Sequence, residues 1–235
     1  MTFEPHPRSF FASEAAPFRL MNADAKASQM AKLGVEKLYE VPFNAALAAL
    51  SPREFAQTVI ADRLGLRHVV IGADFCFGKG RAGKAQDLAD FGAEMGFGVT
   101  IAPLMATGDE TVSSTAIRKA LSAGETRKAA EMLGHFHRIE GPVLHGEKRG
   151  RALGYPTANI SIAGLHPPRY GVYAVKVDVL NGPSAGAYDG VASLGIRPMF
   201  DGDQPNLETF IFDFSGDLYG ADISVGLVRF LRPEA

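Results

Sequence analysis

The sequence predicts two fold classes in one chain of 235 residues, an α/β part with a parallel sheet followed by an all-β barrel. In the first half, short apolar runs that suit buried strands alternate with segments of helical periodicity. In the second half, runs in which apolar and polar residues alternate follow one another with no strong helix between them. The rhythm changes after Gly134, so we expect one domain over residues 1–134 and a second over residues 135–235.

Helix and strand signals alternate along the first half. Ser51 and Glu54 match a capping box with Pro52 in the first turn, which predicts a helix that begins there and ends at Gly65. Residues 68–72 form a continuous apolar run typical of a strand buried on both faces. Alternation at this spacing favours a parallel sheet with crossover helices. The other elements expected here are a helix at 22–33, a strand at 37–43, a helix at 84–95, a strand at 97–103, and helices at 114–122 and 125–133.

Short strands with a period of two residues dominate the second half. Apolar residues alternate with polar or small ones over 173–179, and residues 207–212 and 222–231 form two further strand-like runs. Turn sequences such as NGPSAG and SGD separate these runs. An antiparallel barrel is the expected arrangement, because closure of the sheet removes its exposed edges.

Composition excludes several classes of protein. Apolar residues make up 46% of the chain. Residues 1–134 carry 15 Lys and Arg against 15 Asp and Glu, and residues 135–235 carry 9 against 11, so neither half has the basic excess expected of a nucleic-acid binder. No apolar run approaches the roughly 20 residues that span a bilayer, and the start is unlike a signal peptide. Cys76 is the single cysteine, which excludes an internal disulfide and favours a cytoplasmic location. The sequence indicates no particular oligomeric state.

The segment 141–159 carries the most chemical information. Its glycines permit close backbone approach and its Lys148, Arg149 and Arg151 supply positive charge, a combination that suits a phosphate-bearing ligand. Beyond Pro156, the Thr157 hydroxyl and the Asn159 amide oxygen lie two residues apart, so on extended backbone they share one face and could hold a hard cation. A basic surface hairpin with an ordinary turn is the alternative interpretation.

Glu208 lies in an apolar strand, on the same face as Phe210 and Phe212. A carboxylate in such surroundings needs a partner or a function, and it could act as a general base toward a substrate hydroxyl. The alternative is a glutamate that faces solvent at the edge of a sheet.

Two further candidates lie in the first half. Clustered hydroxyls at Ser113, Ser114 and Thr115 open a helix with Arg118 one turn in, which indicates either an anion site or plain N-capping by Ser114. Residues 72–83 leave the carboxyl end of a predicted parallel strand, where open α/β sheets bind ligands. In that loop, Cys76 between two phenylalanines suits a buried apolar position better than a nucleophile. No Walker A loop, G-x-S-x-G elbow or zinc-ligand spacing of histidines occurs in the sequence.

Taken in order, these segments resemble the prokaryotic bifunctional riboflavin kinase/FMN adenylyltransferase family, also called FAD synthetase. The motifs that carry the resemblance span the chain: TFEPHP at 2–7, GADFCFGKGRAG at 72–83, VSSTAIR at 112–118, HGEKRGRALGYPTAN at 145–159, RYGVY at 169–173, GVASLGIRPMF at 190–200 and LETFIFDFSGDLYG at 207–220.

For the second half, the resemblance implies a riboflavin kinase barrel that uses ATP and Mg²⁺ to convert riboflavin into FMN. Thr157 and Asn159 match the positions that hold the metal, and Glu208 matches the base that activates the ribityl hydroxyl. The kinase's ATP-binding loop would include His145, Gly146, Lys148, Gly150, Arg151, Gly154 and Pro156.

For the first half, the resemblance implies a Rossmann-like nucleotidyltransferase that joins FMN to AMP, which makes FAD and releases pyrophosphate. Ser113, Ser114, Thr115 and Arg118 match its second ATP motif. The regions that line its flavin and nucleotide clefts would include His6, Pro7, Asp74, Phe75, Phe77 and Arg81.

The sequence departs from the family in places. It contains no H-x-G-H phosphate-binding motif and begins where the family's second strand would run, so we expect the first strand of the parallel sheet to be missing and the adenylyltransferase to be impaired. The helix that follows the barrel is also expected to be missing. Ser193 and Met199 replace an Asn and a Thr, which puts ligand contacts there in doubt. A flavin- or nucleotide-binding protein without turnover is the alternative function, against which the base at Glu208 counts.

Overall fold

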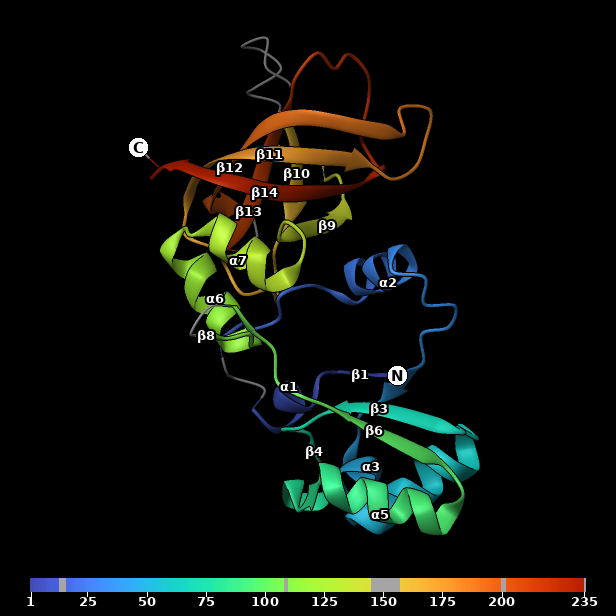
Figure 1. Ribbon diagram of the computed structural model, residues 1–235. Coiled ribbons are helices and arrows are strands. Elements are labelled where there is room, and N and C mark those ends of the chain that lie inside the picture. Colours follow the sequence, from blue (N-terminus) through green and yellow to red (C-terminus); the bar gives the residue numbers. More distant parts are fainter. Residues whose placement is uncertain (13–15, 108–109, 145–156, 200–201, 235) are drawn as a thin grey trace. The chain divides into compact units, whose positions relative to one another are not determined.

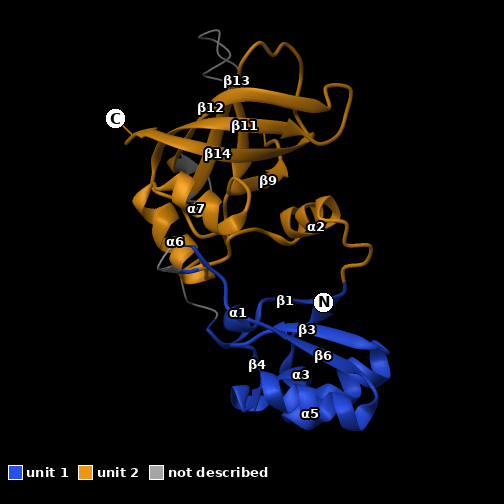
Figure 2. Ribbon diagram, in the orientation of Figure 1, with its two compact units in different colours: residues 1–15, 39–111 blue, residues 16–38, 112–235 orange. Residues whose placement is uncertain are grey.

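The computed structural model describes residues 1–12, 16–107, 110–144, 157–199 and 202–234. The chain divides into two compact units (Figure 2): Met1–Ala15 with Tyr39–Thr111, and Ala16–Leu38 with Val112–Ala235. The first unit holds the α/β elements and the second holds the barrel. The expected combination of an α/β part and an all-β barrel is confirmed.

Parallel strand pairs form the centre of the first unit. β1 (Thr2–Glu4) pairs with β2 (Glu40–Pro42), and β3 (His68–Gly72) pairs with β6 (Gly98–Ala102), both in parallel. The sequence predicted one parallel sheet, but the strands that the structure describes form two separate parallel pairs. The expectation that residues 68–72 form a strand buried on both faces is also wrong, because Val70 of β3 is 67% exposed. Two short antiparallel hairpins complete the unit, β4 (Cys76–Phe77) with β5 (Gly83–Lys84) and β7 (Ala106–Thr107) with β8 (Glu110–Thr111).

Apolar side chains from residues 55–60 and from Leu88 pack against the β3–β6 pair. The Ser51–Glu54 capping box is confirmed, since Glu54 N–H donates to Ser51 Oγ and Ser51 N–H donates to Glu54 Oε2. Phe55, Val59 and Ile60 are buried with Leu88 in the core of this unit. The elements are α1 (Pro7–Phe11), α3 (Ala45–Ala49), α4 (Pro52–Phe55), a π-helical segment η1 (Ala56–Arg63), a 3₁₀ turn η2 (Lys79–Arg81) and α5 (Ala85–Met95).

An antiparallel six-stranded sheet forms the second unit (Figure 1). The strand order is β10-β13-β12-β11-β14-β9, and a bridge between Leu144 and Asn159 brings the two ends of this order together. The sheet is therefore a nearly closed barrel whose interior holds a continuous apolar core. The strands are β9 (Arg138–Pro142), β10 (Thr157–Ser161), β11 (Gly171–Val179), β12 (Gly186–Met199), β13 (Gly202–Ile211) and β14 (Asp222–Arg232).

The described residues of the barrel unit include three helices: α2 (Ala23–Lys32), α6 (Ser114–Ala123) and α7 (Thr126–Leu133). Ser28 Oγ of α2 donates a 2.7 Å hydrogen bond to the buried Glu140 of β9. Thr126 Oγ1 at the start of α7 donates to the carbonyl of Val228 in β14 at 2.9 Å. These polar contacts attach segments that precede Gly134 to the barrel, so the compact units follow spatial packing more closely than chain order. The domain division at residue 134 stays a prediction.

No helix among the described residues combines the length and the apolar character needed to cross a membrane.

Candidate functional site

The outer face of the barrel at β10 and β13 brings the three predicted kinase residues together. Thr157 and Asn159 alternate along β10 with Ala158 and Ile160, which are buried in the interior. The antiparallel register places Asn159 opposite Glu208. Thr157, Asn159 and Glu208 therefore lie on the same face, because directly opposed residues of neighbouring strands point to the same side.

Two short hydrogen bonds organise this face. Thr157 Oγ1 donates to Glu208 Oε1 at 2.6 Å, and Asn206 Nδ2 donates to Asn159 Oδ1 at 2.7 Å. Glu208 is thus an anchored, half-buried carboxylate and not a glutamate that projects freely into solvent. Asn206 was not among the residues predicted from the sequence, although its place two residues before Glu208 on a strand was the signal that could have identified it.

The chemistry of this set is that of oxygen donors around one carboxylate. An ionised carboxylate has several lone-pair sites, so one that accepts a hydrogen bond from a hydroxyl can also accept a proton from another hydroxyl. The hydroxyl of Thr157 and the amide oxygen of Asn159 are neutral oxygens of the type that hard cations bind. Within the described residues there is no cluster of three His, Cys, Asp or Glu side chains that could form a metal site.

The loop that the sequence analysis assigned to ATP lies outside the described residues. That group comprises His145, Gly146, Lys148, Gly150, Arg151, Gly154 and Pro156. The two departures from the family are placed on β12. Ser193 lies opposite Glu208 in the β12–β13 register, and Met199 lies opposite Gly202 near the far end of the same pair.

Several residues that were predicted to line the clefts of the first unit have local structural roles. His6 caps α1, since its Nδ1 accepts a 3.0 Å hydrogen bond from the Arg8 N–H, and Pro7 is the first residue of that helix. Phe75 and Phe77 stack with ring centroids 5.6 Å apart, and both pack against the core of this unit. These two aromatic rings therefore form part of the apolar core of the first unit.

Arg81 and Asp74 lie beside the single cysteine. The thiol of Cys76 donates to the backbone carbonyl of Asp74 at 3.5 Å, and the Lys84 ammonium lies 3.4 Å from its sulfur. The hydrogen bond from Arg81, with smaller contributions from Lys84, lowers the pKa of the Cys76 thiol below its ordinary value. The expectation of a buried apolar cysteine is wrong, because this side chain is only half-buried and lies among cations.

The hydroxyl cluster lies at the start of α6 in the barrel unit. Ser113, not Ser114, is the N-cap, and its Oγ accepts a 3.1 Å hydrogen bond from the Ala116 N–H. Arg118 donates to Thr115 Oγ1 at 3.1 Å and to the backbone carbonyl of Phe18 at 3.3 Å. The guanidinium is therefore held close to the first turn of the helix.

Comparisons with known proteins cover both halves. The family described as FAD synthetase matches residues 1–116, and the family described as riboflavin kinase matches residues 133–235. A bifunctional riboflavin kinase/FMN adenylyltransferase from Pseudomonas fluorescens is 41% identical over 99% of this chain and 73% of its own length. Relatives of the same description from Listeria monocytogenes and Escherichia coli K12 are 38% and 37% identical, each over 100% of this chain and 74% of the relative.

A solved structure supports the same assignment of fold. The crystal structure of a protein described as a macrolide-efflux protein from Streptococcus pneumoniae aligns with a TM-score of 0.82 at 32% identity. The alignment covers 100% of this chain and 75% of the other. Matches to both family descriptions, at this identity and coverage, show that the chain belongs to the bifunctional riboflavin kinase/FMN adenylyltransferase family.

Proposed function

We propose that this chain acts in FAD biosynthesis, with riboflavin phosphorylated to FMN at the outer face of β10 and β13 and FMN adenylylated to FAD by the N-terminal part. ATP is the second substrate of both steps. Membership of the family supports both activities. The substrates are small molecules, and the near balance of charge in the sequence gives no support to a nucleic-acid partner.

One observation carries the kinase assignment, the 2.6 Å hydrogen bond between Thr157 Oγ1 and Glu208 Oε1 with Asn159 on the same face. Glu208 is the general base of the proposed reaction. It accepts the proton of the terminal ribityl hydroxyl as that oxygen attacks the γ-phosphorus of ATP, and ADP leaves. The Thr157 hydroxyl holds one oxygen of this carboxylate and so orients the base on the outer face of the barrel. The chain's main contribution is to align the reactants, since phosphoryl transfer needs little covalent work by protein.

We propose Mg²⁺ as the metal, with Thr157 and Asn159 as the residues that hold it. Both offer neutral oxygens, and the oxygen chemistry of the pair fits a hard cation that takes further ligands from phosphate and water. A bound Mg²⁺ would supply neutralisation of the charge on the phosphates. Asn206 orients the side chain of Asn159 and so keeps its oxygen on this face.

Residues in the glycine-rich loop complete the proposed nucleotide site. Lys148 and Arg151 supply charge for the ATP phosphates, and the loop glycines permit close backbone approach, as argued from the sequence. In the N-terminal part, we propose that Arg118 and the hydroxyls at the start of α6 contact the ATP phosphates, and that the segments around His6 and Asp74 contribute to the flavin and nucleotide clefts. The helix terminus at Ser113 supports an anion there.

The test is incubation of the chain with riboflavin, ATP and MgCl₂, followed by chromatographic separation of flavins. We expect FMN to form, and Glu208→Gln to lower its rate of formation by at least about a hundredfold, as is usual for loss of a general base. Glu94→Gln is the matched control, because Glu94 makes a surface ion pair with Arg53 in the other unit.

The same chromatogram measures FAD, so each activity is read separately. Undiminished FMN formation by Glu208→Gln would disprove the assigned base. A folded chain that binds flavin and makes no FMN would instead support a binding protein without turnover.

A further inference from the structure

The segment that follows β14 crosses the barrel surface toward the candidate kinase site. β14 pairs with β11, and β11 lies between β14 and β12 in the sheet order. Arg232 is still in register with Val172 of β11. Glu234, two residues later, reaches β12, where Ser193 Oγ donates a hydrogen bond to Glu234 Oε1 at 3.2 Å. The segment Arg232–Glu234 therefore passes over the beginning of β11.

Two glycines make room for this crossing. A Cβ atom on Gly171 would collide with the backbone carbonyl oxygen of Arg232, and Gly171 has a φ of +147°, which L side chains rarely adopt. A Cβ atom on Gly195 would collide with the carboxylate of Glu234. The carboxylate therefore lies directly above Gly195, in space that any side chain at that position would occupy.

The segment Arg232–Glu234 ends beside β13, the strand that carries Glu208. Ser193 lies directly opposite Glu208, and Gly195 lies directly opposite Asn206, in the β12–β13 register. Opposed residues share a face, so the Glu234 carboxylate lies on the same outer face of the barrel as Glu208. Because β13 separates β10 from β12, Glu234 approaches Glu208 from the side opposite to Thr157 and Asn159.

We propose that Glu234 is a positioning residue for the riboflavin side of the kinase site. It acts through Ser193 and Gly195, which it holds against the strand that carries Glu208 and Asn206. The proposal rests on the proposed kinase function of this face. Thr157 and Asn159, which are assigned to the metal and nucleotide, lie on the other side of Glu208, so loss of Glu234 affects the flavin and not the ATP.

The experiment compares steady-state kinetics of FMN formation for the full chain and five variants. In Glu234→Ala and Ser193→Ala we expect the KM for riboflavin to rise about tenfold, as for loss of one hydrogen bond to a charged group, with the KM for ATP unchanged. The double variant should be no worse than either single one, because both remove the same contact. Glu234→Gln keeps an oxygen acceptor for Ser193 and should restore the KM for riboflavin to within about twofold. Glu131→Ala, at an exposed glutamate of α7, is the matched control.

The outcomes separate this proposal from the function on which it depends. If the unaltered chain makes no FMN, the proposed function fails. If it makes FMN and Glu234→Ala leaves the KM for riboflavin unchanged, the positioning role is disproved. Equal effects on the KM values of both substrates, or additive effects of the two alanine variants, would also overturn it. A melting temperature measured by circular dichroism identifies a variant that is merely unfolded, and for such a variant Ser193→Ala and Glu234→Gln still decide the question.

Discussion

The hydroxyl of Thr157 donates a 2.6 Å hydrogen bond to the carboxylate of Glu208, from a strand 51 residues earlier in the chain. The bond spans adjacent strands, β10 and β13, and joins the residue proposed to hold a metal to the residue proposed to accept a proton. In the proposed reaction, substrate alignment and proton transfer therefore depend on the same pair of side chains.

Removal of the Thr157 hydroxyl should affect FMN formation far more than stability. Thr157→Val keeps the β-branched shape and removes the donor, and we expect kcat for FMN formation to fall at least about a hundredfold because base and metal ligand are disturbed together. Thr157→Ser retains the hydroxyl and should keep most of the activity. Flavin chromatography under initial-rate conditions measures both variants. Comparable rates for Val and Ser at this position would contradict the role of the hydroxyl.

Acid should destabilise the barrel unit through His137. Burial, and to a smaller extent the nearby His135 and His166, lower the pKa of His137 to about 4 from its ordinary value of 6.5. The folded state holds the His137 proton less tightly than the unfolded state. The contribution of neutral His137 to the free energy of unfolding is therefore fully present above pH 6.5 and is lost as the pH falls from 6.5 toward 4. The contribution is about 3 kcal/mol across that window.

Urea unfolding at pH 7.5 and pH 5 measures this effect. His137→Gln should lose part of this difference in the free energy of unfolding between the two pH values. His135→Gln, at a half-buried position that makes only a smaller contribution to the pKa of His137, should retain most of it. An identical pH dependence for the parent chain and His137→Gln would show that other groups are responsible.

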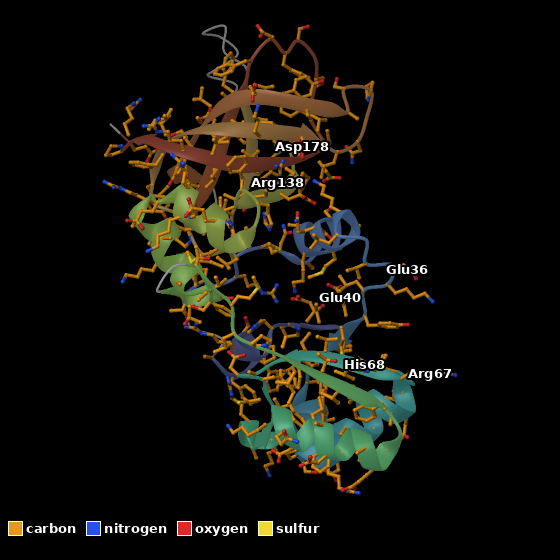
Figure 3. All side chains as sticks on the ribbon, viewed as in Figure 1. Glu36, Glu40, Arg67, His68, Arg138 and Asp178 are labelled. Atoms are coloured by element: carbon orange, nitrogen blue, oxygen red, sulfur yellow. The ribbon has the colours of Figure 1, made fainter. Side chains whose placement is uncertain are left out.

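An ion pair on the barrel should contribute to stability. Figure 3 labels both partners, Arg138 of β9 and Asp178 of β11. Arg138 Nη2 lies 2.8 Å from Asp178 Oδ2, its Nε donates to Ser224 Oγ at 2.8 Å, and its side chain is 17% exposed. Asp178→Asn removes the negative partner of this guanidinium, so we expect the free energy of unfolding to fall by about 2–3 kcal/mol.

Lys32 provides the control for that measurement, since it approaches the same carboxylate at 3.6 Å with a side chain that is 50% exposed. Lys32→Ala should change the free energy of unfolding by less than about 1 kcal/mol. Denaturant titration of the two variants makes the comparison. Equal losses in the free energy of unfolding would contradict the prediction that the more buried ion pair contributes more to stability.

The exposed face of the β3–β6 pair should promote self-association. Val70 is 67% exposed, and among the described strands β3 pairs with β6 alone. A strand with an unpaired edge and an exposed apolar side chain is a template for intermolecular pairing. Val70→Lys should reduce light scattering at high protein concentration and leave the melting temperature within a few degrees. Unchanged scattering would place the associating surface elsewhere.

The start of α6 offers a test that separates helix capping from anion binding. Ser113→Asp keeps a cap acceptor for the Ala116 N–H and adds a negative charge. If the hydroxyl cluster contacts the ATP phosphates, FAD formation from FMN should fall about tenfold or more through charge repulsion while the melting temperature is maintained. If the side chain only caps the helix, the rate of FAD formation should not change.

Local signals in the sequence predicted local structure accurately. The capping box of Ser51 and Glu54 is confirmed because both of its hydrogen bonds close within one helical turn. The two-residue spacing of Thr157 and Asn159 sufficed to place them on one strand face. The choice of Glu208 among the glutamates came from its apolar strand, and its role in the kinase came from resemblance to a family.

Other contacts could not be predicted because they depend on register between distant segments. Asn206 orients Asn159 and Glu234 reaches Ser193 only because β13 lies between β10 and β12, and no local pattern specifies that order. The attachment of α2 to β9 through Ser28 and Glu140 is similar, since it joins segments that the sequence rhythm had assigned to different halves.

The sequence by itself therefore determined the two fold classes and the approximate positions of most elements, because periodicity and capping act over a few residues. It also placed Thr157 and Asn159 on one face of a strand, whereas their proposed role in the kinase came from resemblance to a family. Tertiary structure alone decided which strands are neighbours, how the parallel strands divide into two pairs, and which polar side chains share a face. The physical reason is that sheet register and helix docking are selected by the burial of apolar surface from segments far apart in the chain.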